Sequence, residues 1–189
     1  MTMTKGHRPM MSNGELIVWG YHGTTRARAD AILSGGQFRI SQNPWEWLAD
    51  GVYFWQDAPH RARAWGQQWG CRDGEEVAVL RAQLRLEACL DLLDTEWADL
   101  IWDYAARFET ELSKQDIQLK NYLRGRHELD AAFFNYLVDA MREQGILIQT
   151  VRAAIAEGEV LFEGSPIRRE SHVQIAVRDT TLIDSVELV

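Results

Sequence analysis

The sequence contains only two cysteines, Cys71 and Cys89, which are too few for a disulfide framework or a cysteine-rich metal cluster. We expect both to be reduced thiols in a cytoplasmic protein. No stretch approaches the ~20 consecutive apolar residues of a membrane span, and the polar N-terminal stretch lacks the apolar run of a signal peptide. There is also no glycine-rich phosphate loop of the Rossmann or Walker type. These absences argue against a membrane protein, an exported protein and a P-loop enzyme.

What remains is typical of one globular domain. The chain has 189 residues and 46% of them are hydrophobic, which is enough to bury a core. The net charge of −8 repels nucleic-acid phosphates, so a nucleic-acid substrate would need a local basic patch. Tryptophan is abundant, with eight residues, which indicates either a tryptophan-rich core or aromatic stacking sites.

Short strand patterns and amphipathic helix patterns succeed one another and predict an α+β fold. We expect residues 1–14 to be a flexible lead-in and residues 15–189 to form a single domain, with a helical insertion around 95–145 and a loop-rich segment at 114–128. Strands are expected at 15–21, 38–41, 52–55, 76–86, 89–93, 146–155, 160–162, 173–177 and 182–189. Helices are expected at 26–33, 57–69, 95–113 and 130–144.

Two motifs stand out near the N-terminus. A His22-Gly23-Thr24 turn follows the first expected strand and leads directly into a helix, and a later strand carries Gly51-Val-Tyr53-Phe. This order and spacing closely resemble the ADP-ribosyltransferase catalytic domain, in particular the His-Tyr-Glu branch that includes diphtheria toxin and the poly(ADP-ribose) polymerases. The resemblance covers residues 15–69 and 159–189. It implies a split β-sandwich of two mixed sheets with flanking helices, and NAD bound in the cleft between the sheets.

The resemblance also implies roles for single residues. His22 would hydrogen-bond the adenosine ribose, and the backbone of Gly23, which has no Cβ, would hold the nicotinamide carboxamide. The ring of Tyr53 would pack on the cationic nicotinamide, a contact worth ~0.5–2 kcal/mol, and Trp65 would cover the other side, where relatives often have Tyr. The resemblance also lets Thr24 contact NAD. The alternatives are that His22 is a structural histidine at a strand end, that Tyr53 is a core residue, and that Thr24 only caps the next helix.

The late segment SHVQIAVRDTTLI resembles the closing strand of the family and places Gln174 where the family has its catalytic Glu. A glutamine can accept a hydrogen bond from the ribose, but it brings no negative charge and cannot act as a general base. Relatives that lack the Glu are mono-transferases or inactive. The resemblance therefore implies transfer of single ADP-ribose units and not chain elongation.

His172 and Glu170 precede Gln174 by two and four residues, so both share its face of a regular strand. His172 could position or deprotonate an acceptor. Both are equally well explained as solvated residues at a strand start, and Glu163 is a more remote substitute. Ser41 and Arg39 follow the first helix, where relatives contact the ribose or phosphates of NAD, although a serine there also suits a plain turn.

Arginines gather in three places in this acidic chain. They are Arg61 and Arg63 near Arg72, then Arg124 and Arg126 beside His127, and finally the pair Arg168 and Arg169. Each group could receive a nucleic-acid backbone or be ordinary solvated surface. The last pair carries the most weight because it leads into the expected closing strand.

These features predict a mono-ADP-ribosyltransferase that uses NAD as substrate, without a metal. His22, Tyr53, Gln174, His172 and Glu170 are the expected catalytic residues, and RNA, DNA or protein is the acceptor. Small domains of this kind resemble toxins of toxin–antitoxin or phage-defence systems, which implies a neutralising antitoxin as partner. The alternatives are an NAD glycohydrolase and an NAD-binding module that has lost turnover.

Overall fold

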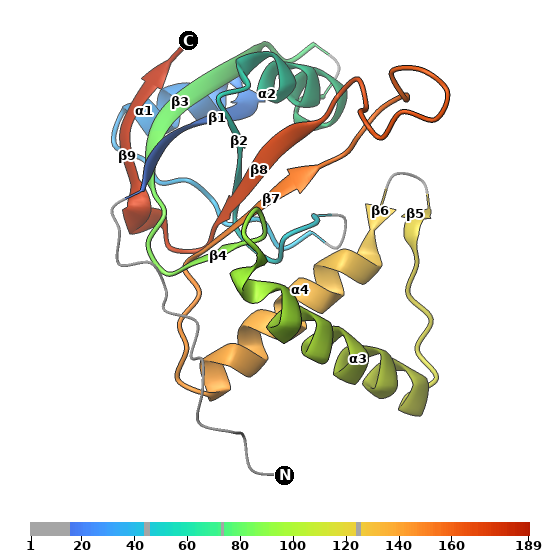
Figure 1. Ribbon diagram of the computed structural model, residues 1–189. Coiled ribbons are helices and arrows are strands. Elements are labelled where there is room, and N and C mark those ends of the chain that lie inside the picture. Colours follow the sequence, from blue (N-terminus) through green and yellow to red (C-terminus); the bar gives the residue numbers. More distant parts are fainter. Residues whose placement is uncertain (1–15, 44–45, 73, 124–125) are drawn as a thin grey trace.

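The structure is a computed structural model that describes residues 16–43, 46–72, 74–123 and 126–189. The predicted flexible segment 1–14 and Arg124 lie outside the described residues. The fold is α+β, as predicted, with helices at both ends of one strongly twisted sheet (Figure 1). Within the described part of the chain, no helix is both long and apolar enough to cross a bilayer.

The sheet has seven strands in the order β4-β7-β8-β2-β1-β3-β9. All neighbours are antiparallel except β4 and β7, so the sheet is mixed. The strands are β1 (Ile17–Thr25), β2 (Val52–Gln56), β3 (Val77–Arg85), β4 (Cys89–Asp91), β7 (Thr150–Ile155), β8 (His172–Val177) and β9 (Ile183–Leu188). A separate small ladder joins β5 (Asn121–Leu123) to β6 (Arg126–His127).

The prediction of two packed sheets is wrong, because β1 and β2 are hydrogen-bonded neighbours in a single sheet. Their contact is short. β1 pairs with β3 along its whole length, but with β2 only at Gly20↔Gln56 and Tyr21↔Trp55. Gly20 makes the junction possible, since a Cβ there would lie 2.9 Å from the Cβ of Phe54. Beyond this junction the strands separate.

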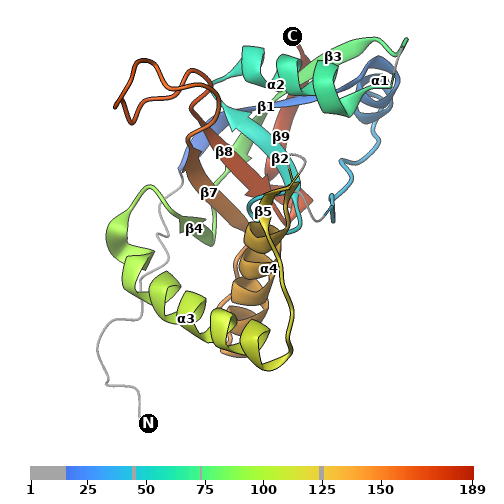
Figure 2. The same cartoon turned by 90° about the vertical axis from the view of Figure 1, so that its right-hand side faces the viewer.

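Two short helices cover opposite faces of the sheet near β1 and β3. Helix α1 (Arg26–Leu33) buries Ala29 against Leu80, whereas α2 (Pro59–Trp65) buries Ala62 against Val79. Leu80 and Val79 are successive residues of β3, and successive strand residues point to opposite faces. A π-helical turn, Gly66–Gly70, extends α2. The turned view in Figure 2 shows both helices beside this end of the sheet.

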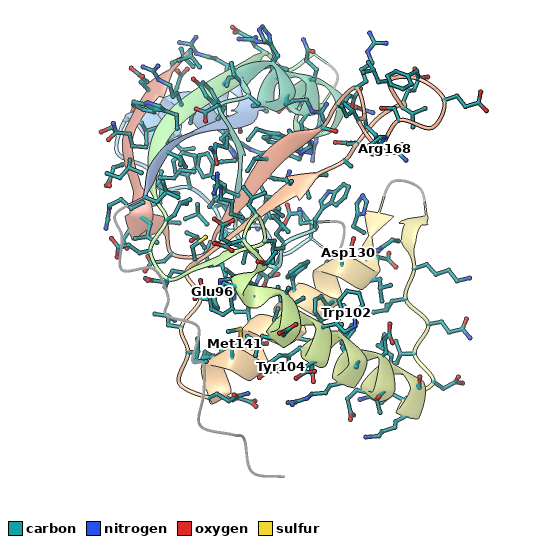
Figure 3. All side chains as sticks on the ribbon, in the orientation of Figure 1. Glu96, Trp102, Tyr104, Asp130, Met141 and Arg168 are labelled. Atoms are coloured by element: carbon teal, nitrogen blue, oxygen red, sulfur yellow. The ribbon has the colours of Figure 1, made fainter. Side chains whose placement is uncertain are left out.

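The other end of the sheet is covered by a helical pair, α3 (Ala98–Lys114) and α4 (Glu128–Glu143), which bear out both helices predicted there. Tyr104 of α3 and Met141 of α4, both labelled in Figure 3, belong to one buried cluster that also contains Val151 of β7 and Ala176 of β8. Single turns of 3-10 helix occur at Thr95–Trp97 and Thr180–Leu182. The segment predicted as a loop contains the β5–β6 ladder.

Two predicted strands are wrong. Residues 38–41 contribute only an isolated bridge between Ser41 and Gly51, and residues 160–162 only a bridge between Val160 and Arg168. The apolar run that suggested a strand at 160–162 is exposed instead of buried. These side chains project from the connection between β7 and β8, so the strand pattern there reflects a surface and not the core.

The packing of α2 on β1 generates a stability prediction. A Cβ on Gly23 would lie 1.9 Å from the carbonyl oxygen of Ala62, which is backbone and cannot move aside cheaply. We expect Gly23→Ala to lower the free energy of unfolding by roughly 1–3 kcal/mol or more, measured by urea denaturation. Gly66→Ala is the matched control, because its Cβ would meet a side-chain methyl of Val77 at 3.0 Å and the backbone of Gly23 only at an ordinary van der Waals distance of 3.6 Å. An equal loss in both variants would contradict the assigned contact.

Candidate functional site

His22 lies on β1 just beyond the junction with β2. Its ring packs against Phe38 and Phe54, with ring centroids 5.5 and 5.6 Å away. Its Nδ1 is 2.9 Å from the carbonyl oxygen of Tyr53. A carbonyl can only accept, so Nδ1 carries the proton and Nε2 is an acceptor in the neutral ring. Burial lowers the pKa of His22 and so favours that neutral form.

Tyr53 points to the opposite face of the sheet from His22. Phe54, whose ring touches His22, is the next residue on β2 and must face the other way from Tyr53. The Tyr53 hydroxyl donates to the Ala49 carbonyl at 2.7 Å and accepts from the Leu48 amide at 2.8 Å. Burial raises the pKa of this phenol. The structure thus joins His22 to the backbone of Tyr53, but it does not bring the two side chains together.

The neighbours of His22 have structural contacts. The open side of Gly23 faces the Ala62 carbonyl of α2. Thr24 is buried, and its carbonyl accepts a hydrogen bond from the Cys71 thiol. The cap of α1 is supplied by Thr25, whose hydroxyl accepts from the Arg28 amide. Capping therefore belongs to Thr25, and Thr24 is held by burial.

Ser41 lies on the segment between α1 and β2. Its backbone exchanges two hydrogen bonds with Gly51, and its hydroxyl accepts from the Asn43 amide group. These contacts fix the entry into β2. Arg39, two residues earlier, is exposed.

A second group of side chains gathers around Trp55 on the face that α2 covers. The Trp55 ring lies 5.6 Å from the ring of Trp65 and 6.3 Å from that of His172. Gln174 is the direct register partner of Trp55 across β2 and β8. With Arg61 of α2 these residues form what we call the Trp55 cluster: Trp55, Arg61, Trp65, His172 and Gln174.

The Trp55 cluster holds four buried polar atoms without a hydrogen-bond partner among the described residues: Trp55 Nε1, Arg61 Nε, His172 Nε2 and Gln174 Oε1. His172 Nδ1 donates to the Glu170 carbonyl at 2.8 Å, so Nε2 is the acceptor of the neutral ring. Burial lowers the pKa of His172 and favours this form. The cluster therefore presents two donors and two acceptors. Each unmatched group costs ~1–3 kcal/mol, so its retention in the fold calls for an explanation, of which a functional role is one.

Arg61 also ties down the connection between β7 and β8, residues 156–171, which we call the 156–171 loop. Its guanidinium forms ion pairs with Glu157 and Glu170, at the two ends of this loop. Glu170 is thus joined to the Trp55 cluster through Arg61 and not through its own contact with Gln174. The sequence-predicted remote alternative, Glu163, is exposed on the same loop.

The 156–171 loop projects away from the body of the protein (Figure 1). It is internally ordered, since the Leu161 amide bonds the Ile167 carbonyl and the Arg169 amide bonds the Glu159 carbonyl, both at 2.9 Å. Its exposed large apolar side chains are Val160, Leu161, Phe162 and Ile167. Arg168 and Arg169 lie on the same loop, where Figure 3 labels Arg168. An ordered loop with an apolar surface therefore stands next to the Trp55 cluster.

The side chains of Arg124 and Arg126 lie outside the described part of the structure. Arg63 and Arg72 are exposed, and His127 stacks on the Trp47 ring with centroids 3.5 Å apart. The described residues contain no group of three side chains able to hold a metal ion.

The structure unites Trp65, His172 and Gln174, and through Arg61 it adds Glu170. Trp55 was not among the site residues expected from the sequence, although the structure places it at the centre of the cluster. Only the pairing register of β2 with β8 reveals this position, since no local signal distinguishes Trp55 from other core aromatics. No known family model matches the chain, and no curated protein matches it.

The two buried histidines generate a pH prediction. Both have a folded pKa below the ordinary value of 6.5, so the unfolded chain binds protons first as the pH falls. Their contribution to stability is complete above about pH 6.5 and is lost as the pH falls through the lowered pKa values. Urea denaturation over this range should show the decline, and His22→Gln and His172→Gln should each flatten it. His60→Gln, at an exposed position, is the control. An unchanged dependence of the free energy of unfolding on pH in both His22→Gln and His172→Gln would contradict burial of neutral rings.

Proposed function

We propose that this protein is an NAD-dependent mono-ADP-ribosyltransferase. The three segments that carry the resemblance to that family are residues 22–24, 51–54 and 171–183, and they include parts of the adjacent strands β1, β2 and β8. The observation that carries the proposal is the set of four unmatched polar atoms in the Trp55 cluster. They occur where α2, β2 and β8 meet, on the opposite face of the sheet from His22.

The chemistry of the Trp55 cluster matches the nicotinamide riboside part of NAD. A carboxamide and sugar hydroxyls both donate and accept hydrogen bonds, and the cluster offers two donors and two acceptors. The indole of Trp65 adds an aromatic face, which attracts the cationic pyridinium ring by ~0.5–2 kcal/mol. We assign Gln174 to the ribose hydroxyl. We assign Tyr53 a supporting role in the wall of the site and no hydrogen bond to NAD, because its hydroxyl is already bonded to the backbone of Leu48 and Ala49.

The proposed reaction is a single transfer for two reasons. Gln174 supplies no negative charge to an oxocarbenium-like transition state, so electrostatic stabilisation is weaker than with a glutamate. His172 is the base we assign to the acceptor, since its Nε2 is unprotonated and unpartnered. A neutral histidine next to a strand of buried residues can take one proton from a bound nucleophile. The five residues of the Trp55 cluster include no carboxylate that could support extension of an ADP-ribose chain.

For the acceptor we propose a protein. The 156–171 loop stands beside the cluster and exposes Leu161 and Phe162, and protein interfaces favour aromatic and apolar anchors at their centre. Nucleic acid would instead require a concentration of cations, which the net charge of −8 opposes. We place the protein among intracellular toxins of toxin–antitoxin or phage-defence systems, with an antitoxin as partner.

Incubation with radiolabelled NAD tests the proposal against its alternatives. Label on a protein fraction supports transfer to protein, and label on RNA or DNA supports transfer but overturns the protein acceptor. Free ADP-ribose without labelled polymer identifies an NAD glycohydrolase. Binding of NAD without release of nicotinamide identifies an inactive binding module, and absence of binding ends the proposal.

Gln174→Leu separates function from structure at this site. It replaces an unmatched buried amide by an apolar group of similar shape, so stability should be unchanged or higher. Loss of the ribose hydrogen bond should lower nicotinamide release about tenfold or more. Gln118→Leu, at an exposed position, is the matched control. A folded Gln174→Leu protein with full nicotinamide release would remove Gln174 from the site.

The loop prediction separates acceptor binding from NAD cleavage. Replacing both Leu161 and Phe162 by Ser should lower labelling of a protein acceptor about tenfold or more, because buried aromatic anchors dominate interface energies. Nicotinamide release into water should stay unchanged, since neither side chain belongs to the Trp55 cluster. Trp102→Ser is the control, as Trp102 is an exposed aromatic on α3. Equal losses in both activities would show that the loop acts on NAD and not on the acceptor.

A further inference from the structure

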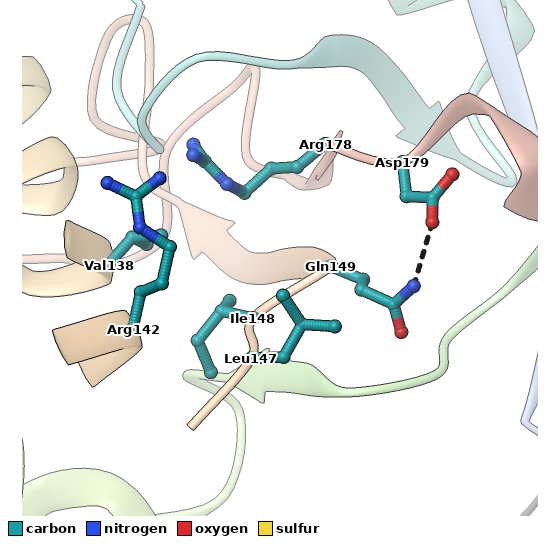
Figure 4. Close-up of a pocket in the computed structure, with 7 residues that line it drawn as sticks. All are labelled: Val138, Arg142, Leu147, Ile148, Gln149, Arg178 and Asp179. Atoms are coloured by element: carbon teal, nitrogen blue, oxygen red, sulfur yellow. Dashed lines mark hydrogen bonds between the residues drawn. The ribbon is translucent and has the colours of Figure 1, made fainter. Parts of the chain in front are cut away.

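A cavity lies at the opposite end of β8 from His172. It has a volume of about 200 Å³ and is formed where the end of α4, the segment before β7 and the residues after β8 meet. Arg142 lines it from α4, and Arg178, the residue directly after β8, lines it from the sheet. Leu147 and Ile148 supply apolar walls (Figure 4). Arg178 is six residues beyond His172, which is about 20 Å along a strand.

Arg178 is a half-buried cation without a carboxylate partner. One of its terminal nitrogens donates to the Asp50 carbonyl at 2.9 Å, but no carboxylate in the described part of the chain lies within 4.0 Å of the guanidinium. Burial lowers the pKa of Arg178, while the charges of Asp50 and Asp139, both beyond 4.0 Å, act in the opposite direction. Burying a cation without a directly paired carboxylate is costly, so an anion entering the cavity would relieve this cost.

The neighbouring carboxylate of Asp179 does not fill this role. It accepts hydrogen bonds from the amide and hydroxyl of Thr181 and from the side chain of Gln149, the last at 2.8 Å. Figure 4 shows this carboxylate directed toward Gln149, on the other side of the cavity from both guanidinium groups. Asp179 thus holds the wall of the cavity, and its charge is already matched by three donors.

Arg142 brings a second positive charge to the same cavity. It pairs with Asp139 through one terminal nitrogen at 3.0 Å, on the exposed side of α4, which leaves other donors of the guanidinium for a ligand. The repulsion from Arg142 contributes to the lowered pKa of Arg178, so the two groups sense each other. Two guanidinium forks that converge from separate elements are well suited to phosphate oxygens.

We propose that this cavity binds a dianionic phosphate group, either free or as a phosphomonoester. The cavity is smaller than the ~300–1,000 Å³ of ordinary small-molecule pockets, which fits one phosphate group and not a whole dinucleotide. In a chain of net charge −8, two convergent arginines at one cavity create a local site of opposite sign. The site is independent of the Trp55 cluster and does not rest on the proposed transferase activity.

Titration calorimetry with inorganic phosphate and with a nucleoside 5′-monophosphate, at constant ionic strength and near-neutral pH, tests the proposal. We expect binding of at least one of them, weakened about tenfold or more by Arg178→Gln and by Arg142→Gln, because each removes charge-assisted hydrogen bonds. Tighter binding of the monophosphate identifies a phosphomonoester as the ligand, and equal or tighter binding of inorganic phosphate identifies the free ion.

Two controls make the test decisive. Arg107→Gln removes the same charge from an exposed position of α3 and should leave the affinity unchanged, and so should Gln174→Leu in the Trp55 cluster. Arg142 is exposed, so its variant is expected to fold even if loss of the Arg178 contact to Asp50 destabilises the other. Absence of binding to the unaltered protein, or an equal loss in Arg107→Gln, would overturn the proposal.

Discussion

Strands β1 and β2 meet over only two residue pairs, and the first involves Gly20, where a Cβ would lie 2.9 Å from that of Phe54 and closer still to the Leu84 side chain. This short junction joins β1, β3 and β9 to β2, β8, β7 and β4 in one sheet. It also sets which side chains can meet. The opening beyond it receives His22 on one face, and on the other face α2 packs on Gly23 and carries Arg61 and Trp65 toward β8. A wider pairing of β1 with β2 would close the space in which both arrangements lie.

The Trp55 cluster and the arginine cavity follow the same physical logic at opposite ends of β8. In each, the fold retains polar or charged groups in partial burial without matching them fully. The two places differ in the hydrogen-bonding groups and charges that they present to a ligand. The Trp55 cluster offers mixed donors and acceptors beside an indole face, whereas the cavity offers two cations and apolar walls. We therefore propose a neutral amide and sugar as the ligand of the first place and a compact anion as the ligand of the second.

Sequence periodicity was sufficient for the long elements of the fold. Helices α3 and α4 were found because their apolar residues repeat over several turns, and β3 because its alternation is sustained. The short apolar runs at 38–41 and 160–162 led to wrong strand predictions. Whether such a run forms a strand depends on a neighbouring strand, which the local sequence does not reveal. The count of sheets was wrong for a related reason. Whether two groups of strands form one sheet or two depends on a single junction at Gly20.

By itself the sequence determined the α+β class, the helical pair, and the common face of His172 and Gln174 on β8, because these depend on periodicity within one element. Tertiary structure alone decided that the Tyr53 phenol faces away from His22, that Trp55 lies opposite Gln174, and that Arg142 and Arg178 share a cavity. Those relations depend on the register between strands and on how helices pack across them. A shift of one residue in register would send each strand side chain to the other face, and no local pattern records that choice.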